Sequence, residues 1–247
     1  MDKFKEGRNS LKDYDRDIID FSKTDQFRGI EMPALEKEIR DGDEIIRLNH
    51  INPQDAPNID LNKAISGRKS IRKYKDKSMT LEEISYLLWA SYGIREIKGK
   101  SVFRNAPSAG NRHAIDIYIS VHDVSGLKEG IYRYHPIENI LVHISSPEDL
   151  RFKMAKAARN QPMAGNSQLT FIWVAVPYRM EWRYSYASYK VIALDAGHIA
   201  QNLYLAAEAI ESGVCAIAAY DQDYSDELLG LDGEDEFVIY MASVGKK

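Results

Sequence analysis

Three short segments of this chain carry side chains that could bind a ligand or take part in a reaction. The first is a basic turn at residues 68–72, which contains Arg68, Lys69, Ser70 and Arg72. Such a turn suits a phosphate group, because a guanidinium donates two parallel hydrogen bonds and a serine hydroxyl adds a short donor. A solvated cluster of surface charges is the alternative interpretation, and this segment alone does not decide between the two.

The second segment spans residues 105–113 and includes Pro107, Ser108, Gly110 and Asn111. Small residues let the backbone approach a flat ligand closely, and the asparagine amide can donate and accept hydrogen bonds at once. An ordinary surface loop would have a similar composition.

The third segment, residues 195–203, opens a predicted helix with apolar residues at helical spacing. Asp195 near the expected N-terminus suits the helix dipole. We interpret His198 and Asn202 as packing and interface residues rather than as catalysts.

Several familiar site motifs do not occur in the sequence. It has neither a GxGxxG turn after a strand nor a GxxxxGK[ST] loop, and it has no HExxH, CxxC or GxSxG motif. The six histidines are scattered. We therefore expect no metal site and no phosphate-binding glycine loop.

The helices and strands that position these segments are predicted from the spacing of apolar residues and from the residues that cap or end helices. A capping box, Thr80 with Glu83, starts a helix that Gly93 stops, and a long helix at 192–212, closed by Gly213, is apolar on most sides. Shorter helices are predicted at residues 62–67, 150–160 and 226–229, and strands at residues 114–121, 130–134, 140–144, 170–176, 214–220 and 237–244. Helices and strands mix without a βαβ rhythm, which predicts the α+β class.

Residues 1–60 differ from the rest, being charged and punctuated by prolines. We interpret them as an arm with one or two short helices ahead of a domain at 61–247; a disordered tail is the alternative. The arm is too apolar for a free tail and is expected to pack on the core or on a partner subunit. Its apolar residues are Phe4, Tyr14, Ile18, Ile19, Phe21, Phe27 and Ile30.

Bulk composition narrows the class of protein. The 247 residues are 44% hydrophobic and carry a net charge of -4, which argues against a general nucleic-acid binder. The single cysteine, Cys215, excludes an intramolecular disulfide. With neither a membrane-length apolar run nor the apolar core of a signal peptide at residues 1–20, we expect a cytoplasmic enzyme or binding protein.

Taken in order, the three segments resemble the nitroreductase family. RKSIRKY at 68–74 resembles its R-R-S-x-R-x-[FY] motif, PSAGN at 107–111 its P-S-x-x-N flavin loop, and DAGHIAQNL at 195–203 its central dimer helix. The phrases LWASYG at 88–93 and GIYRY at 130–134 are similar to the SagB-type branch, whose best known members oxidise azolines in peptides. The resemblance runs from about residue 60 to the C-terminus.

This resemblance implies an α+β fold with a central mixed or antiparallel sheet flanked by helices, in an intertwined homodimer that holds FMN between its subunits. It assigns Arg68, Lys69, Ser70 and Arg72 to the FMN phosphate, Pro107, Ser108, Ala109 and Asn111 to the isoalloxazine and ribityl, the amides of Ala218 and Ala219 to flavin N5, and Lys246 or Lys247 to a second phosphate contact. The two alanines stand where the family has glycines.

One departure bears on the reaction. Azoline-oxidising members carry a Lys-Tyr pair about a dozen residues before the acidic residue of the dimer helix, and here the matching pair is Arg183-Tyr184. Arginine cannot act as a base at ordinary pH, which argues against azoline oxidation. Tyr184 either donates a proton or lines the pocket. The surrounding stretch, residues 178–189, is rich in tyrosine, tryptophan and arginine and could shape a site for a planar or anionic substrate.

Three functions are therefore in view. The leading one is an FMN-dependent reductase that passes hydride from NAD(P)H to a nitro, quinone or other conjugated acceptor. The second is a SagB-type flavin dehydrogenase acting on a peptide azoline. The third is a flavin-binding protein without turnover.

Overall fold

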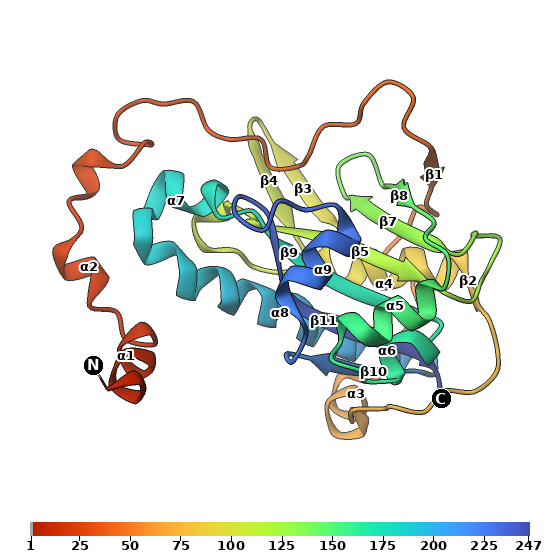
Figure 1. The fold of residues 1–247 in the computed structure, drawn as a ribbon. Coiled ribbons are helices and arrows are strands. Elements are labelled where there is room, and N and C mark those ends of the chain that lie inside the picture. Colours follow the sequence, from red (N-terminus) through yellow and green to blue (C-terminus); the bar gives the residue numbers. More distant parts are fainter. Residues whose placement is uncertain (1) are drawn as a thin grey trace.

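The centre of the molecule is a seven-stranded sheet (Figure 1). A computed structural model describes residues 2–247, apart from the side chain of Asp15. In their order across the sheet, the strands are β1 (Ile45–Arg47), β8 (Ile140–Ser145), β7 (Gly130–His135), β5 (Ile115–Val121), β9 (Leu169–Ala175), β11 (Phe237–Lys246) and β10 (Ser212–Ile217). All neighbours in this sheet run antiparallel. Parallel pairing occurs between β2 (Met79–Thr80) and β6 (Val124–Ser125), and in the Ser70–Val214 bridge.

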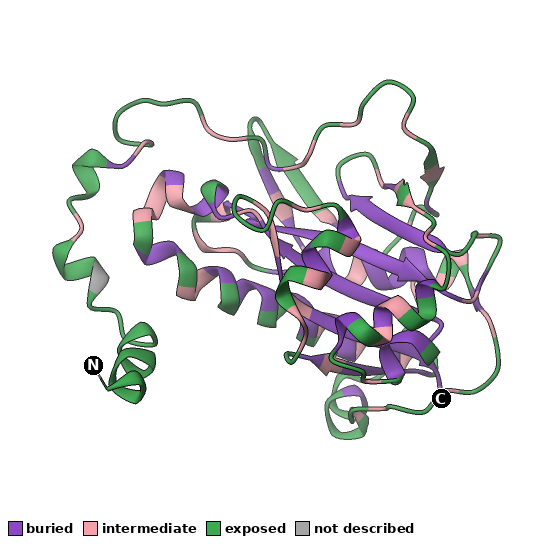
Figure 2. Cartoon of the chain, viewed as in Figure 1, coloured by how far each residue is buried: buried purple, intermediate pink, exposed green. Residues whose placement is uncertain are grey.

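Helices cover both faces of the sheet, so its central strands are buried on both sides (Figure 2). One face packs against α4 (Leu81–Tyr92) and α8 (Ser188–Ala209). The other packs against α5 (Leu150–Ala157), α6 (Met163–Asn166) and α9 (Gln222–Leu229). Alternation along β9 illustrates the division, since Phe171 and Trp173 join the first core while Ile172 and Val174 join the second. The predicted α+β class is confirmed.

Local signals placed most elements well. The capping box forms as predicted, with the Glu83 amide donating to Thr80 Oγ1 and the Thr80 amide donating to the Glu83 carboxylate. The short helix α3 (Leu61–Gly67) begins at an Asp60 cap. No helix of the described chain is long and apolar enough to cross a membrane.

Several predicted helix boundaries were wrong. The long helix, predicted at 192–212, starts earlier, at Ser188, and ends at Ala209. Gly213 does not close it but lies within β10; the turn is made by Glu211, at a positive φ of 53°. The helix predicted at 150–160 ends at Ala157, since Arg159 and Asn160 adopt left-handed φ angles.

The periodicity also missed some elements. A hairpin of β3 (Ile94–Lys98) and β4 (Ser101–Arg104) precedes the Pro107 loop. The aromatic stretch after β9 forms α7 (Tyr178–Tyr184) and a 3-10 turn, Ser185–Ala187. The hairpin has a sequence signal, because apolar residues flank Gly99, which takes a φ of 57° at the turn.

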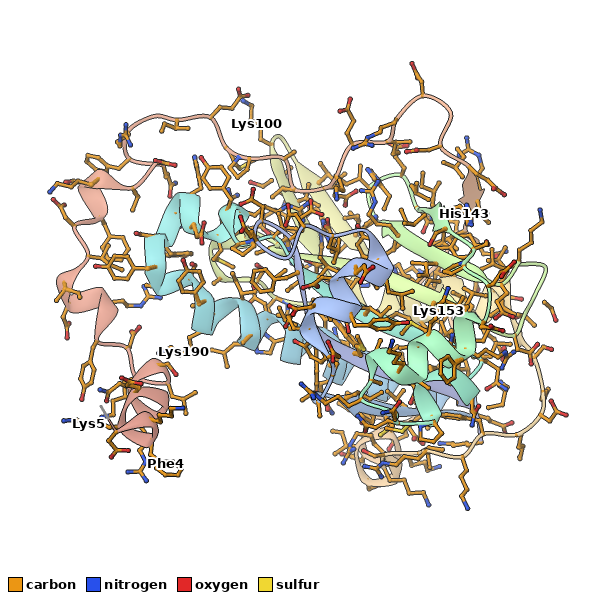
Figure 3. The ribbon with its side chains drawn as sticks, viewed as in Figure 1. Phe4, Lys5, Lys100, His143, Lys153 and Lys190 are labelled. Carbon is orange, nitrogen blue, oxygen red and sulfur yellow. The ribbon has the colours of Figure 1, made fainter. Side chains whose placement is uncertain are left out.

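The first part of the arm stands apart from the body. It contains α1 (Lys3–Ser10), α2 (Asp15–Ile18) and a 3-10 turn, Phe21–Lys23 (Figure 1). Figure 3 shows Phe4 at its far end and Lys190 on the side of the body that faces it. Lys190 Nζ lies 3.6 Å from the Asp13 carboxylate, while Phe4 and Ile18 remain largely exposed.

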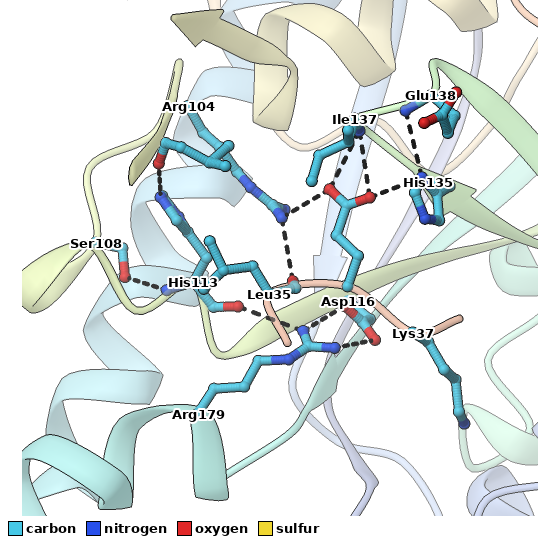
Figure 4. A network of polar contacts seen from close by, with 12 residues as sticks. Leu35, Lys37, Arg104, Ser108, His113, Asp116, His135, Ile137, Glu138 and Arg179 are labelled. Carbon is cyan, nitrogen blue, oxygen red and sulfur yellow. Dashed lines mark hydrogen bonds and ion pairs between the residues drawn. The ribbon is translucent and has the colours of Figure 1, made fainter. Parts of the chain in front are cut away.

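From Thr24 onward the arm packs on the body. The Gln26 amide donates to the Trp182 carbonyl, and the Trp182 indole donates to the Ile30 carbonyl. Glu36 is the centre of a buried polar cluster with Arg104 and His135, the two partners that Figure 4 labels. Its carboxylate lies 3.0 Å from Arg104 Nη2 and 2.7 Å from His135 Nδ1, and both Glu36 and Arg104 side chains are almost fully buried.

We expect Glu36→Ala to lower the free energy of unfolding by about 3–5 kcal/mol, because it leaves the buried Arg104 guanidinium without its carboxylate. Urea unfolding followed by circular dichroism measures this loss. Glu38→Ala is the control, since the Glu38 side chain is exposed and only its backbone carbonyl makes a contact, with Arg133. Equal losses in the two variants would show that the Glu36 cluster does not hold the arm.

Candidate active site

The basic turn lies along the free edge of the sheet. Ser70 pairs with Val214 of β10 in a parallel bridge, and the Ile71 amide donates to the Val214 carbonyl at 2.9 Å. A glycine is required beside it, because a Cβ at Gly213 would sit 2.6 Å from the Ile71 side chain. The Tyr74 hydroxyl fixes the end of the turn, because it donates a hydrogen bond to the Ile71 carbonyl and shares another with Ser243 Oγ.

Beneath this turn lies Tyr204 of α8. Its hydroxyl is 3.1 Å from Ser70 Oγ and accepts a hydrogen bond from the Ala216 amide at 2.8 Å. The Arg68 guanidinium stacks over its ring, 5.2 Å from the centroid. Among the ion pairs of residues 2–247, none involves Arg68, Lys69 or Arg72. Cations without a carboxylate partner suit an anion site.

The two C-terminal lysines are placed differently. Lys246 Nζ lies 2.6 Å from the Glu83 carboxylate and donates to the Ile210 carbonyl, and its side chain is buried. Lys247 Nζ pairs with Glu208 at 2.5 Å. A phosphate contact from either lysine would require one of these pairs to exchange, so that role stays a prediction.

After β10 the chain turns at Ala218 and Ala219, and both residues are exposed. The Gln161 side-chain amide donates to the Ala219 carbonyl and so fixes the turn. Ala218 follows Val214 by four residues, or about 13 Å of extended strand. The basic turn therefore lies beside the first half of this edge strand, and the two alanines follow its C-terminal end.

The Pro107 loop holds an unusual backbone. Gly110, Asn111 and His113 all take positive φ angles, of 57°, 58° and 50°. Ser108 Oγ accepts from the His113 amide, and His113 Nε2 donates to the Val102 carbonyl at 2.8 Å. Burial, followed by the nearby Arg104 charge, lowers the pKa of His113 to about 3, so this imidazole stays neutral. Its role is structural, since its hydrogen bond to the Val102 carbonyl ties the loop to β4.

A buried ion pair ties this loop to α7 (Figure 4). Arg179 donates to both carboxylate oxygens of Asp116 on β5, at 2.6 and 3.1 Å, and to the His113 carbonyl at 3.4 Å. Burial opposes the ionisation of Asp116, but the Arg179 charge outweighs it and holds the pKa of that carboxyl below its usual value.

The predicted pair Arg183-Tyr184 lies directly against the loop. A Cβ at Gly110 would meet the Tyr184 hydroxyl at 2.6 Å and the Arg183 side chain at 2.8 Å. Guanidinium groups also gather here, with Arg16 and Arg183 near the Tyr184 ring and Arg112 over the Trp182 ring at 5.1 Å. Burial, and then the charge of Arg183, lowers the pKa of Arg112.

The structure brings the predicted site residues together in two groups. The Pro107 loop lies at the first half of α8, where the Ala109 amide donates to Asp195 at 3.3 Å. Ser70 lies at the second half, on Tyr204. The nine residues between Asp195 and Tyr204 span about 13 Å of helix. Asp195 lies two turns inside α8, so its predicted place near the helix N-terminus was wrong.

Sequence reasoning missed Arg16, Glu36, Asp116 and the hydroxyl contacts of Tyr204. It included Arg179 and Trp182 only as members of the aromatic stretch 178–189 and did not predict their partners. Tyr204 sits inside a motif that was recognised, but nothing in the motif indicates that its hydroxyl reaches Ser70. The partners of Glu36 lie far along the chain and leave no local signal.

Comparison with known proteins places the chain among relatives. The model of a family described as the nitroreductase family matches residues 65–246. The nitroreductase homologue MJ1384 of Methanocaldococcus jannaschii is 31% identical over 193 residues, which are 78% of this chain and 94% of that protein. The trifolitoxin-processing protein TfxF of Rhizobium leguminosarum bv. trifolii is 28% identical over 73% of this chain and 64% of its own length. A crystal structure of a nitroreductase homologue from Ralstonia eutropha JMP134 shares the fold, with a TM-score of 0.69, 24% identity and coverage of 84% of this chain and 91% of that one.

We expect Asp195→Asn to stabilise the protein increasingly as the pH rises from about 4 to 7. Burial raises the pKa of Asp195 above 3.8, and hydrogen bonds from Ser108 and Ala109 offset this in part. The folded chain therefore holds this proton more tightly than the unfolded chain, and stability is lost as the carboxyl ionises. Asparagine keeps an acceptor for the Ala109 amide and carries no charge.

Thermal unfolding of both proteins across this pH range measures the effect as a widening gap in Tm. Asp76→Asn, at an exposed position on the loop after the basic turn, is the control and should give no such trend. A gap that does not change with pH would contradict the assignment.

Proposed function

This chain belongs to the nitroreductase family, and on that premise we propose that it binds FMN and works as a flavin-dependent oxidoreductase. The observation that carries the proposal is the edge of the sheet at β10. Cations without an ion-pair partner among the described residues lie with the Ser70 hydroxyl beside the first half of this strand, and Ala218 and Ala219 follow its C-terminal end. An extended ligand with a phosphate at one end and a flat ring at the other fits that arrangement.

In this proposal Arg68, Lys69 and Ser70 hold the phosphate, and Arg72 adds to the local positive charge. Bound flavin supplies the hydride chemistry. The amides of Ala218 and Ala219 donate toward flavin N5, and fixed donors of this kind stabilise negative charge as it develops. Pro107, Ser108, Ala109 and Asn111 line the ring and the ribityl chain.

The substrate side is proposed to be the surface shared by the Pro107 loop and α7. Because a guanidinium does not serve as a general base, Arg183 binds or orients a substrate and does not remove a proton. The gathering of Arg16, Arg112 and Arg183 favours a substrate that is planar and anionic. We propose NAD(P)H as the reductant and a nitro, quinone or other conjugated compound as the acceptor.

A second candidate is a dehydrogenase that acts on a peptide, in the manner of the SagB-type branch. The similarity to TfxF, a protein named for trifolitoxin processing, favours it. Arg183 at the place of the expected lysine disfavours azoline oxidation itself.

We propose further that the protein is a homodimer whose flavin sites draw on both chains. In the single chain, one face of α8 packs Ile199, Ala200 and Leu203 into the hydrophobic core. Its other face carries Leu194, Tyr189, Gly197, His198 and Gln201, and these are exposed. A second copy packed on that face would bring its own Pro107 loop toward the basic turn.

We expect purified protein to be yellow, to release FMN rather than FAD, and to lose its colour with NADPH and regain it with an acceptor. A flavin that binds but does not respond to either nucleotide would favour a binding protein without turnover. An apoprotein that cannot be reconstituted with FMN would overturn the proposal.

In the basic turn, which we propose as the phosphate clamp, Arg68→Ala should weaken FMN binding about ten- to a hundredfold. Arg183→Ala, the matched arginine variant, should leave the affinity near its starting value. Titration of FMN into each apoprotein, followed by flavin fluorescence, gives both affinities.

We expect Leu194→Glu to convert the dimer to a monomer and to remove bound flavin, because a charge buried at that seam costs several kcal/mol. Sedimentation velocity at low micromolar concentration reports the mass. Phe152→Glu is the matched control, since Phe152 is an exposed apolar residue on α5, across the sheet from α8. A monomeric parent protein that retains full FMN refutes the shared site.

A further inference from the structure

We propose that Tyr204 is a positioning residue for the phosphate clamp, and that it orients the Ser70 hydroxyl so that its hydrogen is directed to the ligand. The inference rests on the proposed function, since it concerns how FMN is held. Tyr204 is a buried side chain of α8 that contacts Ser70 and Arg68 of the clamp and does not contact the ligand itself.

The position of Tyr204 supports this role. Its side chain rises from α8 and is nearly buried, at 9% exposure, whereas Ser70 above it is exposed. Its hydroxyl contacts Ser70 Oγ and the amide of Ala216 in β10, two residues before the Ala218 amide assigned to the flavin. Its ring carries the third contact, the Arg68 guanidinium.

The direction of the hydrogen bonds follows from the chemistry of the three groups. The Ala216 amide can only donate, so it occupies an acceptor position on the Tyr204 oxygen. The phenol hydrogen needs an acceptor, and among the described residues Ser70 Oγ, at 3.1 Å, is the one within hydrogen-bond distance, so we take Tyr204 as the donor to Ser70. Because the serine oxygen accepts from below, its own hydrogen is directed to the exposed side.

A phosphate dianion needs this polarity, because it offers acceptors and no donor. A Ser70 hydroxyl that donated to Tyr204 would present its oxygen to the phosphate and repel it. The chain from Ala216 through Tyr204 to Ser70 runs in one direction, and hydrogen bonds so aligned strengthen one another. Tyr204 therefore sets Ser70 as a donor before the ligand arrives.

The ring makes a separable contribution. It holds the Arg68 guanidinium over its face, and this cation–π contact limits the conformations of a long side chain. Phenylalanine keeps the ring and the stacking and removes the hydroxyl alone. Tyr204→Phe therefore isolates the hydrogen-bond chain from packing.

The test compares FMN with riboflavin, which is the same ligand without the phosphate. Each is titrated into the apo forms of the parent protein, Tyr204→Phe, Ser70→Ala and the double variant, with flavin fluorescence as the readout. We expect Tyr204→Phe to weaken FMN binding about five- to tenfold and to leave riboflavin binding unchanged. In the Ser70→Ala background, the same change should have no further effect.

Three results would overturn the inference. These are an equal loss for FMN and riboflavin, a full additional loss in the Ser70→Ala background, and no loss of FMN at all. The first two describe a residue that only supports the fold. A parent protein that binds riboflavin and FMN equally, or neither, fails at the proposed function itself, whereas normal FMN binding by Tyr204→Phe removes the relay and leaves that function standing.

Discussion

The bidentate ion pair between Asp116 and Arg179 is the constraint on which the substrate side of the molecule depends. It joins the middle of the sheet to α7 and holds the His113 carbonyl, so the loop and the helix share one anchor. A hydrophobic pair could fill the same volume at no loss of stability, but it could not fix the direction of α7. The direction of α7 decides where Arg183 and Tyr184 contact the loop. A second buried ion pair, between Glu36 and Arg104, holds the arm on the body in the same way.

The two halves of the proposed site are built from different materials. The phosphate side uses regular structure, since an edge strand and a long helix place Ser70 and Arg68 with little strain. The substrate side uses left-handed residues at Asn111 and His113, which cost on the order of 1–3 kcal/mol each and persist because buried partners hold them. In this proposal the phosphate is held by regular structure, whereas the Pro107 loop lines the flavin ring and forms the substrate surface together with α7.

Local chemistry explains what could be predicted. Thr80 with Glu83, and the apolar run of β9, are signals contained within a few residues, and they placed their elements correctly. Gly213 misled because glycine ends helices but also permits close packing, and here it admits Ile71. The motifs identified the candidate residues and could not reveal their partners: that Lys246 faces Glu83, or that Tyr204 reaches Ser70, depends on contacts between residues far apart in the chain.

The order of the chain against its contacts has a consequence for synthesis. Ser70 pairs with Val214, the Lys75 amide with the Lys246 carbonyl, and Lys37 with Glu236, 199 residues away. The segments that a ribosome releases first therefore wait for those it releases last, and such non-local closure is slow. The proposed phosphate site cannot form before β10 and β11 have been synthesised, because Ser70 and Lys75 are held by residues of these two strands.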